Sequence, residues 1–312
     1  MELIRGLHSL AARHRGTVAS IGNYDGVHLG HQTVLRELRR QAEALQVPST
    51  VIVFEPTPQE FFRPASPPAR LMRFGEKFRA LAEYDVARLL CLRFNRQLAD
   101  MSAEDFIERI LVRGLGVRYL VVGDDFRFGH DRRGDFAMLQ QAGKAHGFEV
   151  QDTGTLLAGG ERISSTRIRK ALAAGEMAQA AAMLGRPFAL SGHVLYGAQL
   201  GRKLGFPTAN IALRRRAVPV RGIFAVRVHG VDSTVRNGVA YVGNRPAVGG
   251  LIPLLEVFIF DFDGELYGRR LRVELLHRVR DDAHFASLEA LQTQIQQDVT
   301  AARAWLRQYA AE

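Results

Sequence analysis

The chain has 312 residues, of which 47% are hydrophobic and 24% are charged, an ordinary globular composition. Because this length exceeds that of a single typical domain, we expect two domains. Lysine and arginine outnumber aspartate and glutamate by 42 to 32, a net charge of +10, so the surface should attract nucleotides, phosphates or nucleic acid. The densest basic cluster, Arg214–Arg216, is too short to favour a nucleic-acid-binding protein.

The single cysteine and the apolar segments limit the class of protein further. Cys91 lies in an apolar run and is expected to be a packing residue rather than half of a disulfide or a metal ligand. No apolar stretch approaches the roughly 18 residues of a membrane helix, and the N-terminus lacks the apolar core of a signal peptide. We therefore expect a cytoplasmic protein that does not bind membranes.

The first half of the chain alternates short apolar runs with longer amphipathic segments, which is typical of strands and covering helices in a parallel sheet. The expected strands span residues 17–21, 50–54, 89–92 and 119–122. The expected helices span residues 35–45, 106–111 and, with a break at Gly175, 167–184. The pattern predicts a doubly wound, Rossmann-like α/β domain over residues 1–184.

Residues 185–312 show a different pattern, in which short alternating runs are separated by glycine and proline. The expected strands span residues 193–195, 224–228, 238–242, 255–260 and 271–276. Such runs are typical of a small antiparallel barrel or sandwich. One amphipathic helix is expected after them, over residues 287–309.

The first candidate site is the segment 21–31, which joins the first expected strand to a helix, the place where open α/β sheets bind ligands. Helix N-termini carry free N–H groups and the positive end of the helix dipole, which suit phosphate. Gly22 lets the backbone turn and approach a ligand, and Gly30 leaves space between His28 and His31. On a first helical turn, these two histidines share one face and can reach one phosphoryl group.

Two imidazoles at this position can donate to phosphate oxygens as charge builds on them, which stabilises a transition state electrostatically. No protein nucleophile is needed, because an ionised phosphate oxygen can attack. Two other interpretations of His28 and His31 remain open, a metal site and a simple helix cap. A zinc site would need a third ligand, and neither Cys91 nor the scattered remaining histidines supplies an obvious one.

Two further segments of the first half carry polar groups. Residues 164–167 place three hydroxyls and a guanidinium at an expected helix start, which suits phosphate but also fits an N-cap followed by a surface arginine. Asp124 and Asp125 follow an expected strand, where an ordinary turn with two solvated acids explains them equally well.

Residues 22–32 resemble the G-N-F-D-G-V-H-x-G-H-Q stretch of the bacterial bifunctional riboflavin kinase and FAD synthetase family, with Tyr24 in place of the usual phenylalanine. Further matches follow in order at residues 122–129, 163–169 and 201–210, the last ending in the riboflavin kinase signature P-T-A-N. The resemblance spans nearly the whole chain and is therefore far more specific than any single motif.

The resemblance implies two consecutive reactions. Residues 185–312 would form a riboflavin kinase domain that converts riboflavin and ATP to FMN and ADP. Residues 1–184 would form an FMN adenylyltransferase domain of the nucleotidyltransferase superfamily, which converts FMN and ATP to FAD and pyrophosphate. Mg²⁺ is implied at both steps.

The resemblance also assigns site residues in the first domain. His28, His31 and Arg167 would be catalytic, and the hydroxyls that precede Arg167 would hold the phosphates that leave as pyrophosphate. Segment 54–58 resembles the family's F-x-P-x-P segment and would form part of a wall around the flavin or nucleotide. The residues expected to bind nucleotide or flavin are Gly22, Asn23, Asp25, Gly30, Asp125, Phe126, Ser164, Ser165 and Thr166.

In the kinase domain, Thr208 and Asn210 would be Mg²⁺ ligands, since residues two apart on an extended strand face the same side and offer hard oxygens. Glu256 would be the general base that takes the proton of the ribityl 5′-hydroxyl. Without the resemblance, segment 201–210 is equally consistent with a plain glycine- and proline-containing turn, and Glu256 with an exposed position on an edge strand. The residues expected to line the nucleotide loop are Gly201, Arg202, Gly205 and Pro207.

Several positions of the second half depart from the family pattern. Tyr241 stands where asparagine is usual, Ala247 where threonine is usual, Phe258 where histidine is usual, and Asp282 where glutamate is usual. These changes leave open whether the kinase is fully active. One alternative is an FMN adenylyltransferase with a weakened or flavin-sensing kinase domain. A third interpretation is an RNA-binding barrel, which the lack of aromatic residues with basic neighbours disfavours.

The expected partners are accordingly small molecules, namely ATP, riboflavin and FMN. We expect neither nucleic acid nor a membrane to be bound, and a monomer or weak homo-oligomer.

Overall fold

The computed structural model describes residues 1–123, 125–197, 201, 204–247 and 250–310. Its internal contacts divide the chain into two compact units. The first unit comprises Met1–Pro68 and Met72–Ser164, and the second comprises Ala69–Leu71 and Ser165–Glu312. The helices after Ser164 therefore group with the second unit by contact, and the functional boundary at residues 184/185 stays a prediction.

The first unit is built on a six-stranded parallel sheet with the strand order β1-β4-β3-β2-β5-β6. Its strands are β1 (Glu2–Arg5), β2 (Thr17–Ile21), β3 (Ser49–Glu55), β4 (Arg88–Arg93), β5 (Val117–Val122) and β6 (Glu149–Asp152). The four strands expected from apolar runs are thus confirmed as the four inner strands. The short edge strands β1 and β6 were not predicted.

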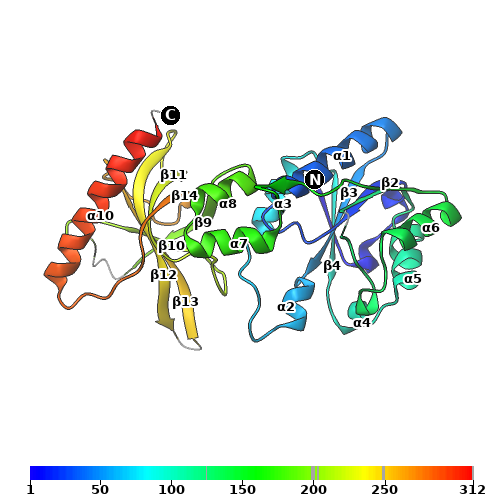
Figure 1. Ribbon diagram of the computed structural model, residues 1–312, viewed down its shortest axis with the longest axis horizontal. Coiled ribbons are helices and arrows are strands. Elements are labelled where there is room, and N and C mark those ends of the chain that lie inside the picture. The colour runs from blue at the N-terminus through cyan, green and yellow to red at the C-terminus, as the bar shows by residue number, and fades with distance from the viewer. Residues whose placement is uncertain (124, 198–200, 202–203, 248–249, 311–312) are drawn as a thin grey trace. The chain divides into compact units, whose positions relative to one another are not determined.

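Helices cover both faces of this sheet (Figure 1). The helices are α1 (Leu29–Leu45), α2 (Pro58–Phe62), α3 (Phe74–Ala82), α4 (Arg96–Ala99), α5 (Ala103–Phe106) and α6 (Phe136–His146). Leu35 and Leu38 of α1 are fully buried with Leu81 of α3 on one face, and Phe106 and Leu139 pack into the core on the other. The doubly wound α/β prediction is therefore confirmed.

Some local elements of the first unit differ from the expected ones. The helix expected over residues 106–111 is α5 followed directly by a π-helical turn, η3 (Ile107–Val112). Short 3-10 turns occur at η1 (Leu7–Ser9), η2 (Ala12–His14) and η4 (His130–Arg132), and β7 (Leu157–Ala158) pairs with β8 (Glu161–Arg162) as a small hairpin.

The second unit contains a closed antiparallel barrel with the order β10-β13-β12-β11-β14-β9. Its strands are β9 (Phe188–Leu195), β10 (Ala209–Ala212), β11 (Gly222–His229), β12 (Arg236–Ala247), β13 (Gly250–Ile259) and β14 (Arg270–Arg280). The predicted choice between barrel and sandwich is resolved in favour of the barrel.

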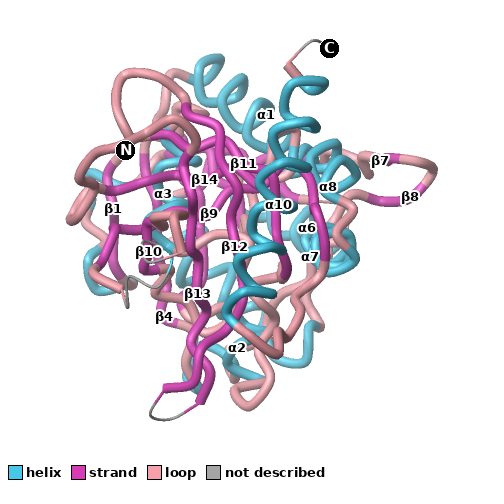
Figure 2. The backbone as a smooth tube through the Cα atoms, turned by 90° about the vertical axis from the view of Figure 1, so that its left-hand side faces the viewer, coloured by secondary structure: helices cyan, strands magenta, loops and turns pink. Residues whose placement is uncertain are grey.

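Among the described residues, three helices accompany the barrel. Helices α7 (Ser165–Ala174) and α8 (Met177–Leu184) are separated by Gly175, whose φ of 79° suits a glycine, as predicted from the sequence. The last helix, α10 (Leu288–Tyr309), is capped by Ser287 and packs on the outside of the barrel against β11, β12 and β14 (Figure 2). Within the part of the chain that the structure describes, no helix is long and apolar enough to span a membrane.

Candidate active sites

The histidine pair of the first unit lies at the N-terminus of α1. His28 is the N-cap residue, and its Nδ1 accepts a hydrogen bond of 3.3 Å from the backbone N–H of His31. The two rings stack with centroids 3.6 Å apart and planes inclined by 17°. An accepting Nδ1 places the proton of the neutral His28 ring on Nε2, which makes Nε2 a donor. The capping interpretation thus holds for His28 and is compatible with an anion site.

The turn before α1 is strained. Tyr24, Gly26 and Val27 have φ angles of 48°, 88° and 41°. A positive φ is unusual for a β-branched residue such as Val27 and costs about 1–3 kcal/mol. The turn is held by the side-chain amide of Gln32, which donates to the Val27 carbonyl at 3.0 Å, and by the Asp25 carboxylate, which accepts from the N–H of residue 72 at 2.9 Å. Asp25 therefore shapes this turn.

Two buried polar atoms of this turn have no hydrogen-bond partner among the residues that the structure describes: Asn23 Oδ1 and His31 Nδ1. A buried polar atom left unsatisfied costs about 1–3 kcal/mol. Strain and unsatisfied atoms gathered at one helix N-terminus are features of a ligand site rather than of a structural turn.

The electrostatic surroundings of His31 favour its neutral form. Burial lowers the pKa of His31 well below its usual value, and the nearby charges of His28, Lys77 and Arg162 lower it further. Lys77, on α3, is only 1% exposed, and its Nζ lies 3.6 Å from Oε1 of Glu55. The sequence did not single out Lys77, because a lysine on an amphipathic helix usually faces water.

Other predicted residues of the first unit gather around α1. A Cβ placed on Gly30 would lie 3.3 Å from the His28 ring and 4.0 Å from the carbonyl of Ile163, so the chain leading into Ser164 passes close to the helix start. Arg162 is paired with Asp125, which joins the segment after β5 to the hairpin β7–β8. Across the described residues, no group of three His, Cys, Asp or Glu side chains could hold a metal ion.

The remaining predicted hydroxyls and arginine lie at the start of α7. Ser165, Thr166 and Arg167 form its first turn and belong by contact to the second unit, whereas Ser164 belongs to the first. Residues at a helix start are suited to phosphate, as the sequence indicated.

Aromatic side chains form a cluster after β3. Phe94 packs edge-on against Phe54, Phe61 and Phe62, with ring centroids 5.4–5.8 Å apart. Phe62 is 63% exposed, which is unusual for so large an apolar side chain. Sequence reasoning identified Phe54 but missed the other three residues. Phe126 stacks on Phe128, with planes inclined by 12°.

The predicted kinase residues meet on the barrel. Asn210 on β10 is directly paired with Glu256 on β13, so both side chains lie on one face of the sheet. Thr208 lies directly before β10, two residues from Asn210. A Cβ on Gly201 would lie 3.2 Å from Thr208 Oγ1, so the glycine-rich loop folds back over the threonine. These hydroxyl, amide and carboxylate oxygens form a set suited to Mg²⁺.

One hydrogen bond closes the loop on itself, and another fastens it to α10. The backbone N–H of Phe206 donates to the Gly201 carbonyl at 2.8 Å, and Gln292 of α10 donates to the Leu204 carbonyl at 3.1 Å. Gly205 has a φ of 86°, which only glycine adopts readily, and Pro207 is exposed beside it. Arg202 and its neighbours 198–200 and 203 lie outside the described residues.

Most of the residues that differ from the family pattern make contacts that the structure shows. Phe258 packs edge-on against Phe206 of the loop at 5.5 Å and against Phe260 at 5.9 Å, so the aromatic ring in place of histidine extends an apolar wall. The hydroxyl of Tyr241 donates to Asp282 at 3.2 Å. The side chain of Ala247 lies outside the part of the barrel that the structure describes.

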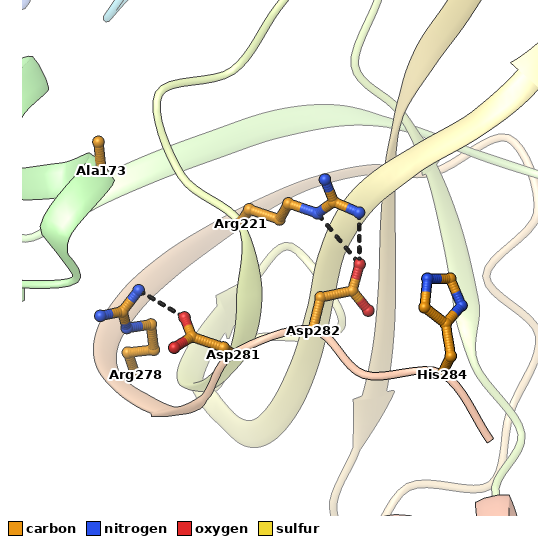
Figure 3. A pocket seen from close by; sticks show the side chains of 6 residues that line it. All are labelled: Ala173, Arg221, Arg278, Asp281, Asp282 and His284. Carbon is orange, nitrogen blue, oxygen red and sulfur yellow. Dashed lines mark hydrogen bonds and ion pairs between the residues drawn. The ribbon is translucent and has the colours of Figure 1, made fainter.

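A pocket of about 300 Å³ opens at the end of β14 (Figure 3). It is lined by Ala173, Arg221, Arg278, Asp281, Asp282 and His284. The sequence did not predict it, because its residues come from three separate segments. Arg221 pairs with Asp282 and Arg278 pairs with Asp281, so opposite charges alternate around the opening.

A Rossmann-like unit with a histidine pair at a helix start, joined to a barrel with an oxygen-rich loop, is the architecture of a nucleotidyltransferase fused to a small-molecule kinase. Residues 10–167 match the family model of FAD synthetase, and residues 184–306 match that of riboflavin kinase. The chain belongs to the bifunctional riboflavin kinase/FMN adenylyltransferase family.

Individual relatives agree along the full length. The bifunctional riboflavin kinase/FMN adenylyltransferase of Pseudomonas fluorescens is 52% identical, and that of Escherichia coli K12 is 48% identical, each over 97% of both chains. A crystal structure from Streptococcus pneumoniae, described as a macrolide-efflux protein, matches with a TM-score of 0.84 over 98% of this chain and 100% of that chain, at 28% identity. The fold of both units is therefore shared with a solved structure.

Proposed function

We propose that the first unit transfers AMP from ATP to FMN through the site at the start of α1, and that the barrel phosphorylates riboflavin through the site around Glu256. Both activities are those of the family, so the chain makes FAD from riboflavin in two ATP-dependent steps. The observation that carries the first assignment is the stacked pair His28–His31, with the buried Nδ1 of His31 unpartnered among the described residues.

In the adenylyl transfer, a phosphate oxygen of FMN attacks the α-phosphorus of ATP, and pyrophosphate leaves. The Nε2–H of His28 and the ring N–H of His31 donate to the non-bridging oxygens as negative charge builds on them. Ser164, Ser165, Thr166 and Arg167 would hold the departing phosphates. The aromatic cluster around Phe62 would provide a flat apolar surface for the flavin ring.

In the kinase reaction, the carboxylate of Glu256 accepts the proton of the ribityl 5′-hydroxyl as its oxygen attacks the γ-phosphorus of ATP, and ADP leaves. The loop Gly201–Pro207 would cover the phosphates. Thr208 and Asn210 would hold Mg²⁺, which neutralises phosphate charge. The match of residues 184–306 to riboflavin kinase favours this function over an adenylyltransferase with a merely flavin-sensing barrel.

The remaining expectations concern the whole chain. We place the functional boundary at residues 184/185, with ATP, riboflavin and FMN as the small-molecule partners and Mg²⁺ required at both steps. The net charge of +10 suits ATP and FMN, which are anionic, without nucleic acid or membrane as a partner. A cytoplasmic monomer or weak homo-oligomer is expected, which light scattering after gel filtration would test.

The residue assignments are tested by resolving flavin products after incubation with ATP and Mg²⁺. His28→Ala should lower the rate of FAD formation from FMN by about 100-fold or more, as loss of an oxyanion donor does, and should leave FMN formation from riboflavin unchanged. Glu256→Gln should do the reverse, because a neutral amide cannot accept the proton.

Exposed residues of the same kinds supply controls. His146→Ala, near the end of α6, and Glu265→Gln, between β13 and β14, should leave both rates unchanged. Loss of both activities in either site variant would contradict the assignment of separate sites, and an unchanged rate of FAD formation in His28→Ala would remove that residue from the mechanism.

A further inference from the structure

Glu256 lies on β13 and has a different partner on each of the two neighbouring strands. It is directly paired with Asn210 on β10 and, on the other side, with Tyr241 on β12. Directly paired residues of antiparallel strands point to the same face, with Cβ atoms about 4.5–5.5 Å apart. Tyr241 packs into the apolar cluster that includes Val299 of α10, so this face is the outer one that α10 covers. In the sequence, Tyr241 stands out only as a departure from the family pattern.

Asn210, Glu256 and Tyr241 form a row across three neighbouring strands. The order of these residues indicates the direction in which the substrate lies. The proposed Mg²⁺ ligands, Thr208 and Asn210, are on one side of Glu256. The hydroxyl that is phosphorylated must lie at the Glu256 carboxylate, within hydrogen-bond reach. The rest of the substrate molecule therefore extends away from β10, across β12, where Tyr241 is the residue that it meets beside the base.

The phenol of Tyr241 is held in one orientation. Its hydroxyl donates to Oδ2 of Asp282 at 3.2 Å, and the same oxygen accepts from Nε and Nη2 of Arg221 at 3.0 and 2.8 Å. The ring lies over Gly243, where any Cβ would clash with the phenol. Burial raises the pKa of Tyr241, and the negative charge of Asp282 raises it further, so the phenol keeps its proton and remains a donor.

The anchoring carboxylate remains charged. Burial alone would raise the pKa of Asp282, but hydrogen bonds from Arg221 and Tyr241 outweigh it and lower the pKa. Arg221 and Asp282 also line the pocket at the end of β14 (Figure 3). The two residues that anchor Tyr241 therefore line an open space, and Tyr241 itself lies on β12, next to the strand that carries Glu256.

We propose that Tyr241 is a specificity residue of the kinase site, whose ring forms the surface on which riboflavin lies beside Glu256, and that Asp282 and Arg221 are positioning residues that hold this ring. The inference rests on the proposed role of Glu256. Because the ring is already held in place, little side-chain conformational entropy is lost when a flat aromatic substrate binds to it. The fixed ring also favours flat substrates over those of another shape.

Steady-state kinetics of FMN formation test this with three variants. Tyr241→Phe keeps the ring but removes the anchor, and Asp282→Asn weakens the same contact. Each should raise the KM for riboflavin about three- to tenfold, with kcat within about twofold and the KM for ATP unchanged. Tyr241→Leu removes the ring and should raise the KM for riboflavin more than tenfold. The double variant Tyr241→Phe/Asp282→Asn should equal the larger single effect, because both break one contact.

Asp232→Asn is the matched control, since Asp232 forms a similar pair with Arg236 in the same barrel through bonds of 2.9 and 2.6 Å. It should leave the KM for riboflavin unchanged, and all variants should convert FMN to FAD normally. An unchanged KM for riboflavin in Tyr241→Phe, or an equal rise in the KM for ATP, would overturn the proposal. Full kinase activity in Glu256→Gln would instead show that Glu256 is not the general base. The effect of the Tyr241 variants on the KM for riboflavin would still be tested independently by their own kinetics.

Discussion

At the scale of single residues, the proposed phosphate site at the start of α1 centres on the histidine pair. His28 uses one nitrogen to cap α1 and keeps the other as a donor. His31 is held neutral by burial and by neighbouring cations. In the proposed reaction, a neutral His31 would bind the triphosphate through a hydrogen bond rather than as a fixed cation.

The neutral state of His31 predicts a pH dependence of local stability. Its pKa is lower in the folded chain than the usual 6.5 that applies to the unfolded chain. The unfolded state therefore takes up the proton first as the pH falls, so the stability of this region is full above pH 6.5 and is lost below it. Between pH 6.5 and 5.5 the loss should be about 1 kcal/mol, measured as hydrogen-exchange protection of α1 after correction for intrinsic exchange rates.

His31→Gln cannot take up this proton and should show a shallower pH dependence of α1 protection. His146→Gln changes an exposed histidine of α6 and should retain the wild-type dependence. Parallel curves for wild type and His31→Gln would contradict a depressed pKa at His31.

The sequence could predict part of these sites and not the rest. His28 and His31 were identified because their spacing and position after a strand are local features. Lys77 was missed, because its burial depends on tertiary packing that its own helix does not encode. The contact of Tyr241 with Asp282 joins residues 41 positions apart, so only the folded barrel brings them together.

At the scale of elements, burial decides which parts of the fold the sequence predicts. Strand β2 was predicted correctly because all five of its residues are buried, which requires an apolar run. Strand β6, at the sheet edge, has only exposed and half-buried residues and so lacks any such run. The barrel strands extend beyond the predicted segments, since β12 and β13 continue into a long hairpin.

Helix α10 is joined to the barrel by a buried ion pair, which gives a prediction at this scale. Asp298 is 5% exposed on its side chain, and its two oxygens accept from Nε and Nη2 of Arg280 at 2.8 and 2.7 Å. Asp298→Asn leaves Arg280 partly buried without its counter-charge and should destabilise the barrel by about 2–3 kcal/mol. In differential scanning calorimetry the barrel transition should move to lower temperature.

Asp261→Asn breaks the exposed pair of Asp261 with Arg303, also on α10, and should change this transition little. Brief heating provides a functional measurement: Asp298→Asn should lose FMN formation at a lower temperature than wild type, while FAD formation from FMN persists. Equal heat sensitivity of the two activities would argue against a role confined to the barrel.

At the scale of the whole molecule, Glu256, the proposed general base, and the histidine pair belong to different compact units. The contacts described for Glu256 come from barrel strands, and those of His28 come from the turn and helix of the first unit. The contact-based division places α7 and α8 with the barrel, so Ser165–Arg167, predicted for adenylyl transfer, belong by contact to the second unit. Sequence periodicity could not reveal this grouping, because it shows which face of a helix is buried but not which other element that face packs against.

Separate sites predict that the two reactions can be completed by different molecules. A chain with His28→Ala should still make FMN, and a chain with Glu256→Gln should still adenylylate it. Mixed in equal amounts with riboflavin, ATP and Mg²⁺, the two variants should form FAD after a lag during which free FMN accumulates. Neither variant alone should form FAD from riboflavin at a comparable rate. If the mixture forms neither FAD nor free FMN, although Glu256→Gln converts added FMN, then the FMN made by His28→Ala is not released from that chain.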